Sequence, residues 1–399
     1  MNGGRAIPPS GLRSPEAHSS PESRAFRPRH VSHPFYKVSR EARSSLHSGS
    51  EEVRVLSDHD LNDQGATSAV DGEWIRGLPK AEVHVHLEGC FDADQIVQLA
   101  AAAGEPLPRP RRRLFELPDL PALLEFLDWV CGLVRTHEQV EQAAYRFAER
   151  EARSGVRYAD LIFNPTHWPW RDRLGAFIEA LDAGFSAAER DGLPSVGLCV
   201  SLLRQQSASE AEELVDWLVE RKHPRVVALS IDGNEAAAGR TGPRFADAFA
   251  RAAAGGLRRT VHAGESSGPE GVWDAVELLG AERIDHGIKA VEDPELVQRL
   301  ADSGVPLGVC PGSNVALGLY PDLRSHPIEA LRAAGVPVSV NTDDPASLET
   351  DLVSEYFATA KAFDWTEAIV RDVARTSIES SFCDEGLKRE LLAELDPSP

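Results

Sequence analysis

From Leu78 onward, hydrophobic and polar residues follow two distinct periods, one typical of strands and one typical of helices. Short apolar runs rich in β-branched residues alternate with longer segments whose apolar residues recur at helical spacing. The runs predict eight strands, over Ala81–Leu87, Arg157–Phe163, Ser195–Leu202, Val226–Ile231, Arg259–Ala263, Arg283–Asp285, Pro306–Cys310 and Pro337–Asn341. The intervening segments predict amphipathic helices, such as Glu210–Arg221, Arg244–Ala254, Pro269–Leu279 and Pro294–Ser303. Eight strands alternating with helices predict an α/β fold, a (β/α)8 barrel of the TIM type.

The pattern divides the chain into an N-terminal tail, residues 1–72, and a barrel domain, residues 73–399. The tail is rich in Ser, Pro, Arg and His and has no sustained period, so we expect it to be disordered. Its Arg- and Ser-rich start also resembles an organelle transit peptide, which is the alternative interpretation.

A longer helical insertion, about Leu117–Ser154, follows the first predicted strand. Its apolar stretch, Leu123–Val130, predicts either a lid over the mouth of the barrel or a plain helix of the outer ring.

Charge is distributed unevenly along the chain. The formal net charge is −21, whereas residues 1–50 carry eight Arg or Lys and three Glu, which leaves −26 on the remainder. A domain with this much negative charge would repel the phosphate backbone of a nucleic acid. We therefore expect no nucleic-acid partner. No apolar run reaches the roughly 18 residues of a membrane span, so we expect no membrane partner either.

The five cysteines are scattered and form no CxxC pair. This distribution is typical of reduced thiols, and the N-terminus has no apolar segment of the secretory type. We therefore expect a cytoplasmic protein.

Chemically reactive side chains follow the predicted strands. His84 and His86 are two residues apart on a strand, so both rings point to the same side. His262 closes the fifth predicted strand and Asp343 the eighth, and the carboxyl ends of barrel strands meet on one face. Three imidazoles and a carboxylate suit zinc. The alternative, hydrogen-bonded core histidines, is disfavoured because many buried polar atoms would need partners.

Three further polar groups and one glycine accompany these ligands. Zinc lowers the pKa of a bound water to about 7. His286 is placed to take that water's proton and to hold the oxygen in line, and Glu265 to give a proton to a substrate ring nitrogen. Asp344, next to the expected ligand Asp343, is not expected to coordinate the metal and can accept a hydrogen bond from the substrate. Gly233 lets a substrate ring approach the backbone closely.

The segments that carry these residues resemble the adenosine/adenine deaminase family of the amidohydrolase superfamily. They are LPKAEVHVHLEG (78–89), VHAGE (261–265), RIDHG (283–287), CPGSN (310–314) and NTDDP (341–345), and the resemblance covers roughly Leu78 to Leu395. It implies zinc at His84, His86, His262 and Asp343. It also implies that Glu265 protonates purine N1, His286 serves the attacking water, Asp344 contacts N7 and the Gly233 backbone contacts N3.

By the same resemblance, the reaction replaces a 6-amino group with oxygen and releases ammonia. Binuclear amidohydrolases bridge two metals with a modified lysine at the end of strand four. The segment Ser230–Glu235 contains no lysine, so we expect one zinc per chain.

The substrate pocket departs from the adenosine deaminase pattern. Those enzymes typically read HLDG after strand one, with the Asp at the ribose, whereas this chain has Glu88, which we expect to bind substrate. Further departures are Asn164–Trp168 after strand two, Arg204-Gln205 after strand three and Ser230 on strand four. Each change either alters the ribose side of the pocket or is neutral.

The favoured function is therefore zinc-dependent deamination of a small-molecule purine, a 6-aminopurine nucleoside such as adenosine, to an inosine-type product. Free adenine and an aminodeoxyfutalosine-type nucleoside are the alternative substrates. A different amidohydrolase reaction on an amide or ester, or a non-catalytic binding protein, are alternatives of another class. The sequence leaves the oligomeric state open.

Overall fold

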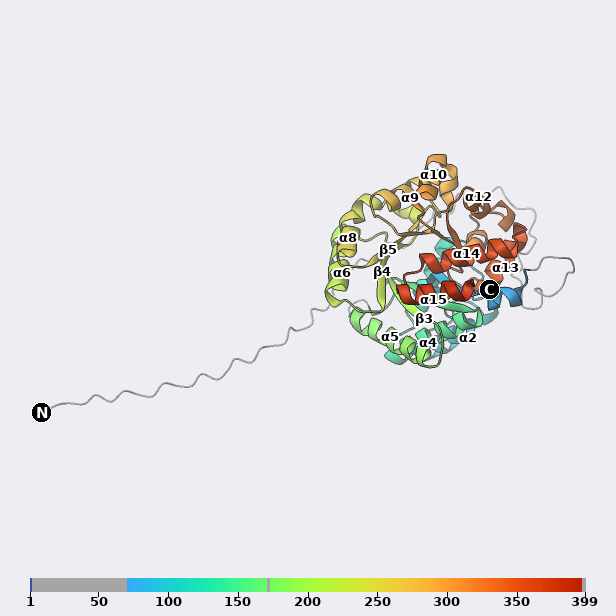
Figure 1. The fold of residues 1–399 in the computed structure, drawn as a ribbon. Helices are drawn as coiled ribbons and strands as arrows, with labels where there is room; N and C mark the ends of the chain where they lie inside the picture. Colours follow the sequence, from blue (N-terminus) through green and yellow to red (C-terminus); the bar gives the residue numbers. More distant parts are fainter. Residues whose placement is uncertain (2–69, 171–172, 397–399) are drawn as a thin grey trace, which may run out of the picture.

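The computed structural model describes Met1 and residues 70–170 and 173–396. Eight parallel strands pair in chain order from β1 to β8. The barrel closes where Val85 bridges Asp343: the His86 N–H donates to the Asp343 carbonyl at 2.8 Å, and the Asp343 N–H to the His84 carbonyl at 3.1 Å. Helices surround the strands (Figure 1), so the predicted TIM-type barrel is confirmed.

All eight predicted strands are present, with bounds within one residue of those expected. They are β1 Lys80–His86, β2 Val156–Phe163, β3 Ser195–Leu203, β4 Val226–Asp232, β5 Arg258–Ala263, β6 Arg283–His286, β7 Leu307–Val309 and β8 Val338–Val340. Both faces of the strands are buried, so β2, β3 and β4 are largely apolar, whereas β1 and β6 also bury charged side chains such as Lys80, Glu82 and Arg283.

The helices likewise follow the predicted periodicity. They are α1 Gly72–Gly77, α2 Ala93–Ala103, α3 Leu120–Cys131, α4 His137–Arg153, α5 Leu174–Arg190, α6 Ala208–Arg221, α7 Glu235–Ala238, α8 Gly242–Ala254, α9 Pro269–Glu277, α10 Pro294–Ser303, α11 Pro311–Ala316, α12 Ile328–Ala333, α13 Leu352–Ala362, α14 Glu367–Ser380 and α15 Glu385–Leu395. Short 3-10 turns follow β1 and β6, namely η3 Leu87–Gly89 and η6 Ile288–Glu292.

The insertion after β1 divides into two different helices. α4 belongs to the outer ring and packs against α5. α3 starts at Asp119, whose carboxylate caps the Ala122 N–H at 3.0 Å, and its leucines line the pocket at the barrel mouth. The stretch Leu123–Val130 lies in α3 at the pocket, which favours the lid interpretation over the outer-ring one.

The amino-terminal end of the barrel is plugged by the C-terminal part of the chain. The Ser377 hydroxyl accepts the Ala81 N–H at 3.0 Å, and Asp160 accepts the Phe382 N–H at 3.0 Å. Arg283, fully buried, pairs with Asp160 at 2.7 Å below the site. Helices α14 and α15 lie in front of the strands in Figure 1. Among the described residues, the pocket that holds the candidate site lies at the opposite, carboxyl end of the barrel.

Most of the predicted tail lies outside the described residues, so its disorder stays a prediction. The described barrel domain begins slightly before the expected boundary: Val70 is buried, and Asp71 caps α1 by accepting the Trp74 N–H at 2.7 Å. Within residues 70–170 and 173–396, no helix is both long and apolar enough to cross a membrane.

Candidate active site

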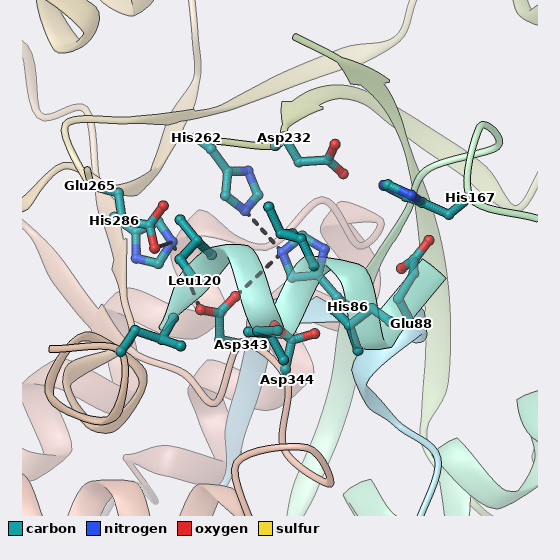
Figure 2. A pocket seen from close by; sticks show the side chains of 15 residues that line it. His86, Glu88, Leu120, His167, Asp232, His262, Glu265, His286, Asp343 and Asp344 are labelled. Carbon is teal, nitrogen blue, oxygen red and sulfur yellow. Dashed lines mark hydrogen bonds and ion pairs between the residues drawn. The ribbon is translucent and has the colours of Figure 1, made fainter. Parts of the chain in front are cut away.

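The four expected metal ligands converge at the carboxyl end of the barrel. Asp343 Oδ1 lies 3.2 Å from His84 Nε2 and 3.4 Å from His86 Nε2. His86 Nε2 in turn lies 2.9 Å from His262 Nε2. One donor atom from each of the four residues falls within 4.8 Å of every other. Figure 2 shows His86, His262 and Asp343 turned toward one another.

These donor atoms fit a divalent cation. His84 Nδ1–H donates to the Gly308 carbonyl at 2.8 Å, so in the neutral ring Nε2 carries a lone pair, and this atom is buried without a hydrogen-bond partner. The Ser313 hydroxyl donates a hydrogen bond to Asp343 Oδ2 at 2.6 Å, which leaves Oδ1 facing the imidazoles. His86 Nε2 and His262 Nε2 cannot both carry a proton at their separation. Three imidazole nitrogens and one carboxylate oxygen match a zinc donor set.

The electrostatics of this cluster favour added positive charge. Burial lowers the pKa of His84, but the carboxylates of Asp285 and Asp343 outweigh burial and raise it to about 9. Burial raises the pKa of Asp343, yet the surrounding imidazoles, His84 foremost, lower it strongly. A carboxylate that stays ionised beside three imidazoles is the arrangement a cation needs.

A second combination of ligands, with Cys310 and His286 beside His84 and Asp343, is also geometrically close. Cys310 Sγ lies 3.4 Å from Nδ1 of His84, the nitrogen that already donates to Gly308. Burial also raises the thiol pKa of Cys310 well above its usual value, so the thiolate form is disfavoured. The set with three histidines and Asp343 is therefore the better metal site.

Two site residues have strained backbones. His286 has φ +67° and Asp343 φ +68°, in the left-handed region that non-glycine residues rarely adopt. Hydrogen bonds between β1 and the segment after β8 stabilise this conformation at Asp343. Asn341 Oδ1 accepts the Val83 N–H at 2.9 Å, and Glu82 Oε1 accepts the Thr342 N–H at 2.9 Å. Such strain is typical of active sites. Sequence reasoning did not identify these supports, although Asn341 and Thr342 belong to the NTDDP segment.

Glu265 and His286 stand side by side next to the metal ligands. Glu265 Oε1 lies 3.5 Å from His286 Nε2. Burial and then the charge of Asp343 raise the pKa of Glu265 to about 8, so its carboxyl carries a proton at neutral pH. Glu235, which sequence reasoning missed, accepts the backbone N–H groups of Gly264 at 3.0 Å and Glu265 at 3.1 Å and so positions this loop.

Asp344 is buried, and its Oδ1 has no hydrogen-bond partner. Burial and then the charge of Asp343 raise the pKa of Asp344 well above its usual value, which favours a carboxyl that donates over the accepting role expected from sequence. It packs on Gly89, where a Cβ would lie 2.1 Å from Asp344 Oδ1, so no larger residue fits. Gly233 lines the pocket with φ +94°. The structure thus places both residues where they were expected.

The far end of the pocket is polar. Glu88, His167 and Asp232 face the cavity there, away from Glu265 and His286 (Figure 2). Glu88 Oε1 accepts the Asn164 N–H and the Trp168 indole N–H, each at 2.8 Å, whereas Oε2 is buried without a partner. The second oxygen is therefore available to a ligand.

His167 joins this end of the pocket to the lid helix. Its Nδ1 hydrogen-bonds Asp128 of α3. Burial lowers the pKa of His167, but the hydrogen bond and charge of Asp128 outweigh burial and raise it to about 9. The roof above is apolar and consists of Leu120, Leu123, Leu124 and Leu127 of α3 together with Leu317.

The other two departures from the adenosine deaminase pattern do not line this pocket. Arg204 is buried, and its guanidinium donates to the Gly233 carbonyl at 3.1 Å, to the Thr241 hydroxyl at 3.1 Å and to the His262 carbonyl. It therefore ties together the ends of β4 and β5. Ser230 is fully buried on β4.

The chain is similar to known deaminases over most of its length. The family model described as adenosine deaminase matches residues 79–398. An aminodeoxyfutalosine deaminase of Streptomyces avermitilis is 36% identical over 333 residues, covering 81% of this chain and 92% of that protein. An adenine deaminase of Rhizobium meliloti is 35% identical over 322 residues, covering 80% and 98%. A zinc-bound amidohydrolase structure from Burkhoderia ambifaria has a TM-score of 0.77 at 28% identity, covering 84% and 94%.

Proposed function

The chain belongs to the adenosine deaminase family, and on that premise we propose that it is a zinc-dependent hydrolase that deaminates a 6-aminopurine nucleoside. The observation that carries the proposal is the adjacency of two groups: a four-residue donor set fit for zinc, and a buried, proton-bearing Glu265 beside it.

The pocket offers hydrogen-bond partners that suit an aminopurine ring. Purine N1, N3 and N7 are all acceptors and need donors. Glu265 carries a proton for N1, and the Gly233 backbone approaches N3 from β4. The protonated carboxyl of Asp344, whose Oδ1 is buried without a partner, can donate to N7. Carbon 6 of such a ring would then face His84, His86, His262 and Asp343.

The reaction balances with these residues alone. Glu265 gives its proton to N1 as the water oxygen bonds to C6, and its carboxylate is then restored by one proton of the water. The remaining water proton leaves on the 6-amino nitrogen as the C6–N bond breaks, which yields ammonia and a 6-oxopurine. Zinc, when bound, lowers the pKa of water so that a nucleophile is available at neutral pH.

The polar far end of the pocket supports a nucleoside. Glu88 Oε2 is a buried, unpartnered acceptor, and Asp232 and the cationic His167 lie beside it. Several sugar hydroxyls can satisfy such a set, whereas free adenine offers one ring N–H there. Free adenine is the second candidate, because 35% identity to an adenine deaminase favours it. With three carboxylates near the far end, Glu88, Asp232 and Asp128, we expect a 5′-phosphate to be disfavoured.

The test is ammonia release from adenosine, deoxyadenosine, adenine, AMP and aminodeoxyfutalosine, each at equal concentration with zinc-loaded protein. We expect adenosine or another nucleoside to be the best substrate and the Glu265→Gln variant to be inactive on all of them. Adenine as the best substrate would assign the second candidate. No ammonia from any of the five would refute the proposed function.

A further inference from the structure

Asn314, the last residue of the CPGSN segment (310–314), has no role in the reaction described so far, yet it lies fully buried between two histidines. We propose that Asn314 and His326 are positioning residues that hold His286 as its Nε2–H tautomer, so that His286 donates a hydrogen bond to the attacking water instead of taking its proton. The part that concerns the water rests on the proposed function, whereas the tautomer can be tested without it.

The direction of this hydrogen-bond chain is set by a backbone amide. The Ile328 N–H, at the start of α12, points to His326 Nδ1 at 3.2 Å. A backbone N–H can only donate, so Nδ1 must accept. A neutral His326 therefore carries its proton on Nε2. Burial lowers the pKa of His326 to about 4, which favours the neutral form.

The orientation of the Asn314 amide follows from His326. His326 Nε2 lies 3.1 Å from Asn314 Oδ1, and an Nε2–H needs an acceptor there, which the amide oxygen supplies. The amide NH2 is then on the other side, where Nδ2 lies 3.3 Å from His286 Nδ1. Since an amide NH2 only donates, His286 Nδ1 must be an acceptor.

His286 therefore carries its proton on Nε2. That nitrogen lies 3.5 Å from Glu265 Oε1 and 3.9 Å from Asp343 Oδ2, in the space between the metal ligands and the proton donor. An N–H aimed into this space can orient a water oxygen. A doubly protonated His286 would set a ring N–H against the Asn314 NH2, which the chain of hydrogen bonds opposes.

Further contacts hold Asn314 and His326, the two residues of this hydrogen-bond network, in place. Asn314 belongs to α11, and its carbonyl accepts the N–H groups of Leu319 at 2.9 Å and Tyr320 at 3.3 Å. The ring of Tyr320 packs against that of His326, with centroids 5.0 Å apart. Exchanging the ends of the Asn314 amide would break both of its side-chain hydrogen bonds.

One consequence concerns the water's proton. Sequence reasoning expected His286 to take it, but a nitrogen that already carries a proton cannot. Once Glu265 has protonated the substrate, its carboxylate is an acceptor beside His286, with Oε1 at 3.5 Å from His286 Nε2. Glu265 then handles both protons, and His286 fixes the direction of attack.

The tautomer can be read directly by ¹⁵N NMR of full-length protein labelled with ¹⁵N-histidine, with and without zinc. The His286 signals are identified by their loss in the His286→Gln variant. We expect a protonated Nε2 and a non-protonated Nδ1 in both samples. A proton on Nδ1 would overturn the proposal, whatever the activity.

Variants test which residues hold the tautomer. Asn314→Leu keeps the shape of the side chain but removes the donor, so we expect His286 to become a mixture of tautomers. kcat/KM for the best substrate should then fall roughly tenfold, the size of one hydrogen bond. His326→Leu should behave alike. His326→Gln, whose amide NH2 can still donate to Asn314, should keep the tautomer and most of the activity.

His223→Gln is the matched control, because His223 lies in the loop before β4, near Asp182 and away from the site. It should change neither the His286 signals nor kcat/KM. An Nε2–H tautomer that persists in both leucine variants would refute the roles of Asn314 and His326. An inactive wild-type protein with the expected tautomer would refute only the deaminase function.

Discussion

Glu88 offers the sharpest test of how the pocket distinguishes a nucleoside from a free base. Its two carboxylate oxygens have different surroundings: Oε1 accepts two N–H groups from Asn164 and Trp168, each at 2.8 Å, and Oε2 is buried without a partner. In Glu88→Gln the amide oxygen can keep both protein hydrogen bonds, while the NH2 group replaces the free acceptor. The substitution therefore changes what the ligand meets and little else.

For the ionised form of Glu88, the expected magnitude follows from one hydrogen bond to a charged acceptor, about 1.5–3 kcal/mol. At about 1.4 kcal/mol per factor of ten, kcat/KM for adenosine should fall roughly 10- to 100-fold. Adenine has no sugar hydroxyl to lose, so the ratio of kcat/KM for adenosine over adenine should fall about tenfold or more. The melting temperature should stay near that of the wild type.

Glu88→Asp is the informative companion. It withdraws the carboxylate by about 1.5 Å, one carbon–carbon bond. Both 2.8 Å hydrogen bonds to Asn164 and Trp168 would then exceed bonding distance, and the buried indole N–H would lose its acceptor. We expect unfolding free energy to fall by about 1–3 kcal/mol, in contrast to Glu88→Gln.

The assay is initial-rate ammonia release with adenosine and with adenine, alongside thermal unfolding of each variant. An unchanged ratio in Glu88→Gln, with both activities present, would mean that Glu88 does not read the sugar. Specificity would then have to come from His167 and Asp232.

Five further expectations follow. Purified protein should contain close to one zinc per chain by elemental analysis, and His84→Ala should lose both metal and activity; two tightly held metals would contradict the mononuclear site. Glu265→Gln should keep zinc but lose turnover by roughly 10²–10⁴-fold, and loss of zinc would mean that Glu265 is a ligand. Because the pKa of Glu265 is about 8 and the protonated carboxyl is the active form, kcat/KM should fall as pH rises above about 8; a rate that keeps rising there would contradict the donor role. Asp128→Asn should raise KM severalfold with kcat nearly unchanged, since it weakens the link between the lid and His167. Deleting residues 2–69 should leave activity and melting temperature nearly unchanged, and an insoluble product would show that the segment belongs to the fold.

The sequence by itself determined the barrel and singled out the candidate metal ligands that the structure brings together. Strand and helix periods are local properties, and the expected ligands lie at or just after strand ends: His84 and His86 on β1, His262 on β5 and Asp343 after β8. Once eight strands are ordered in a barrel, the fold itself brings those ends to one face. The spatial neighbours of each ligand did not have to be known in advance, because the barrel topology brings the ligands together.

The tertiary structure alone decided how those side chains are held and protonated. Glu88 is anchored by residues 76 and 80 positions away, His84 by a carbonyl 224 positions away, and His286 by an asparagine whose own orientation depends on His326. Donors and acceptors at such separations leave no periodic signal in the chain. Their pairing depends on ångström-scale distances that exist only once the barrel has closed, which is also when burial raises the pKa of Glu265.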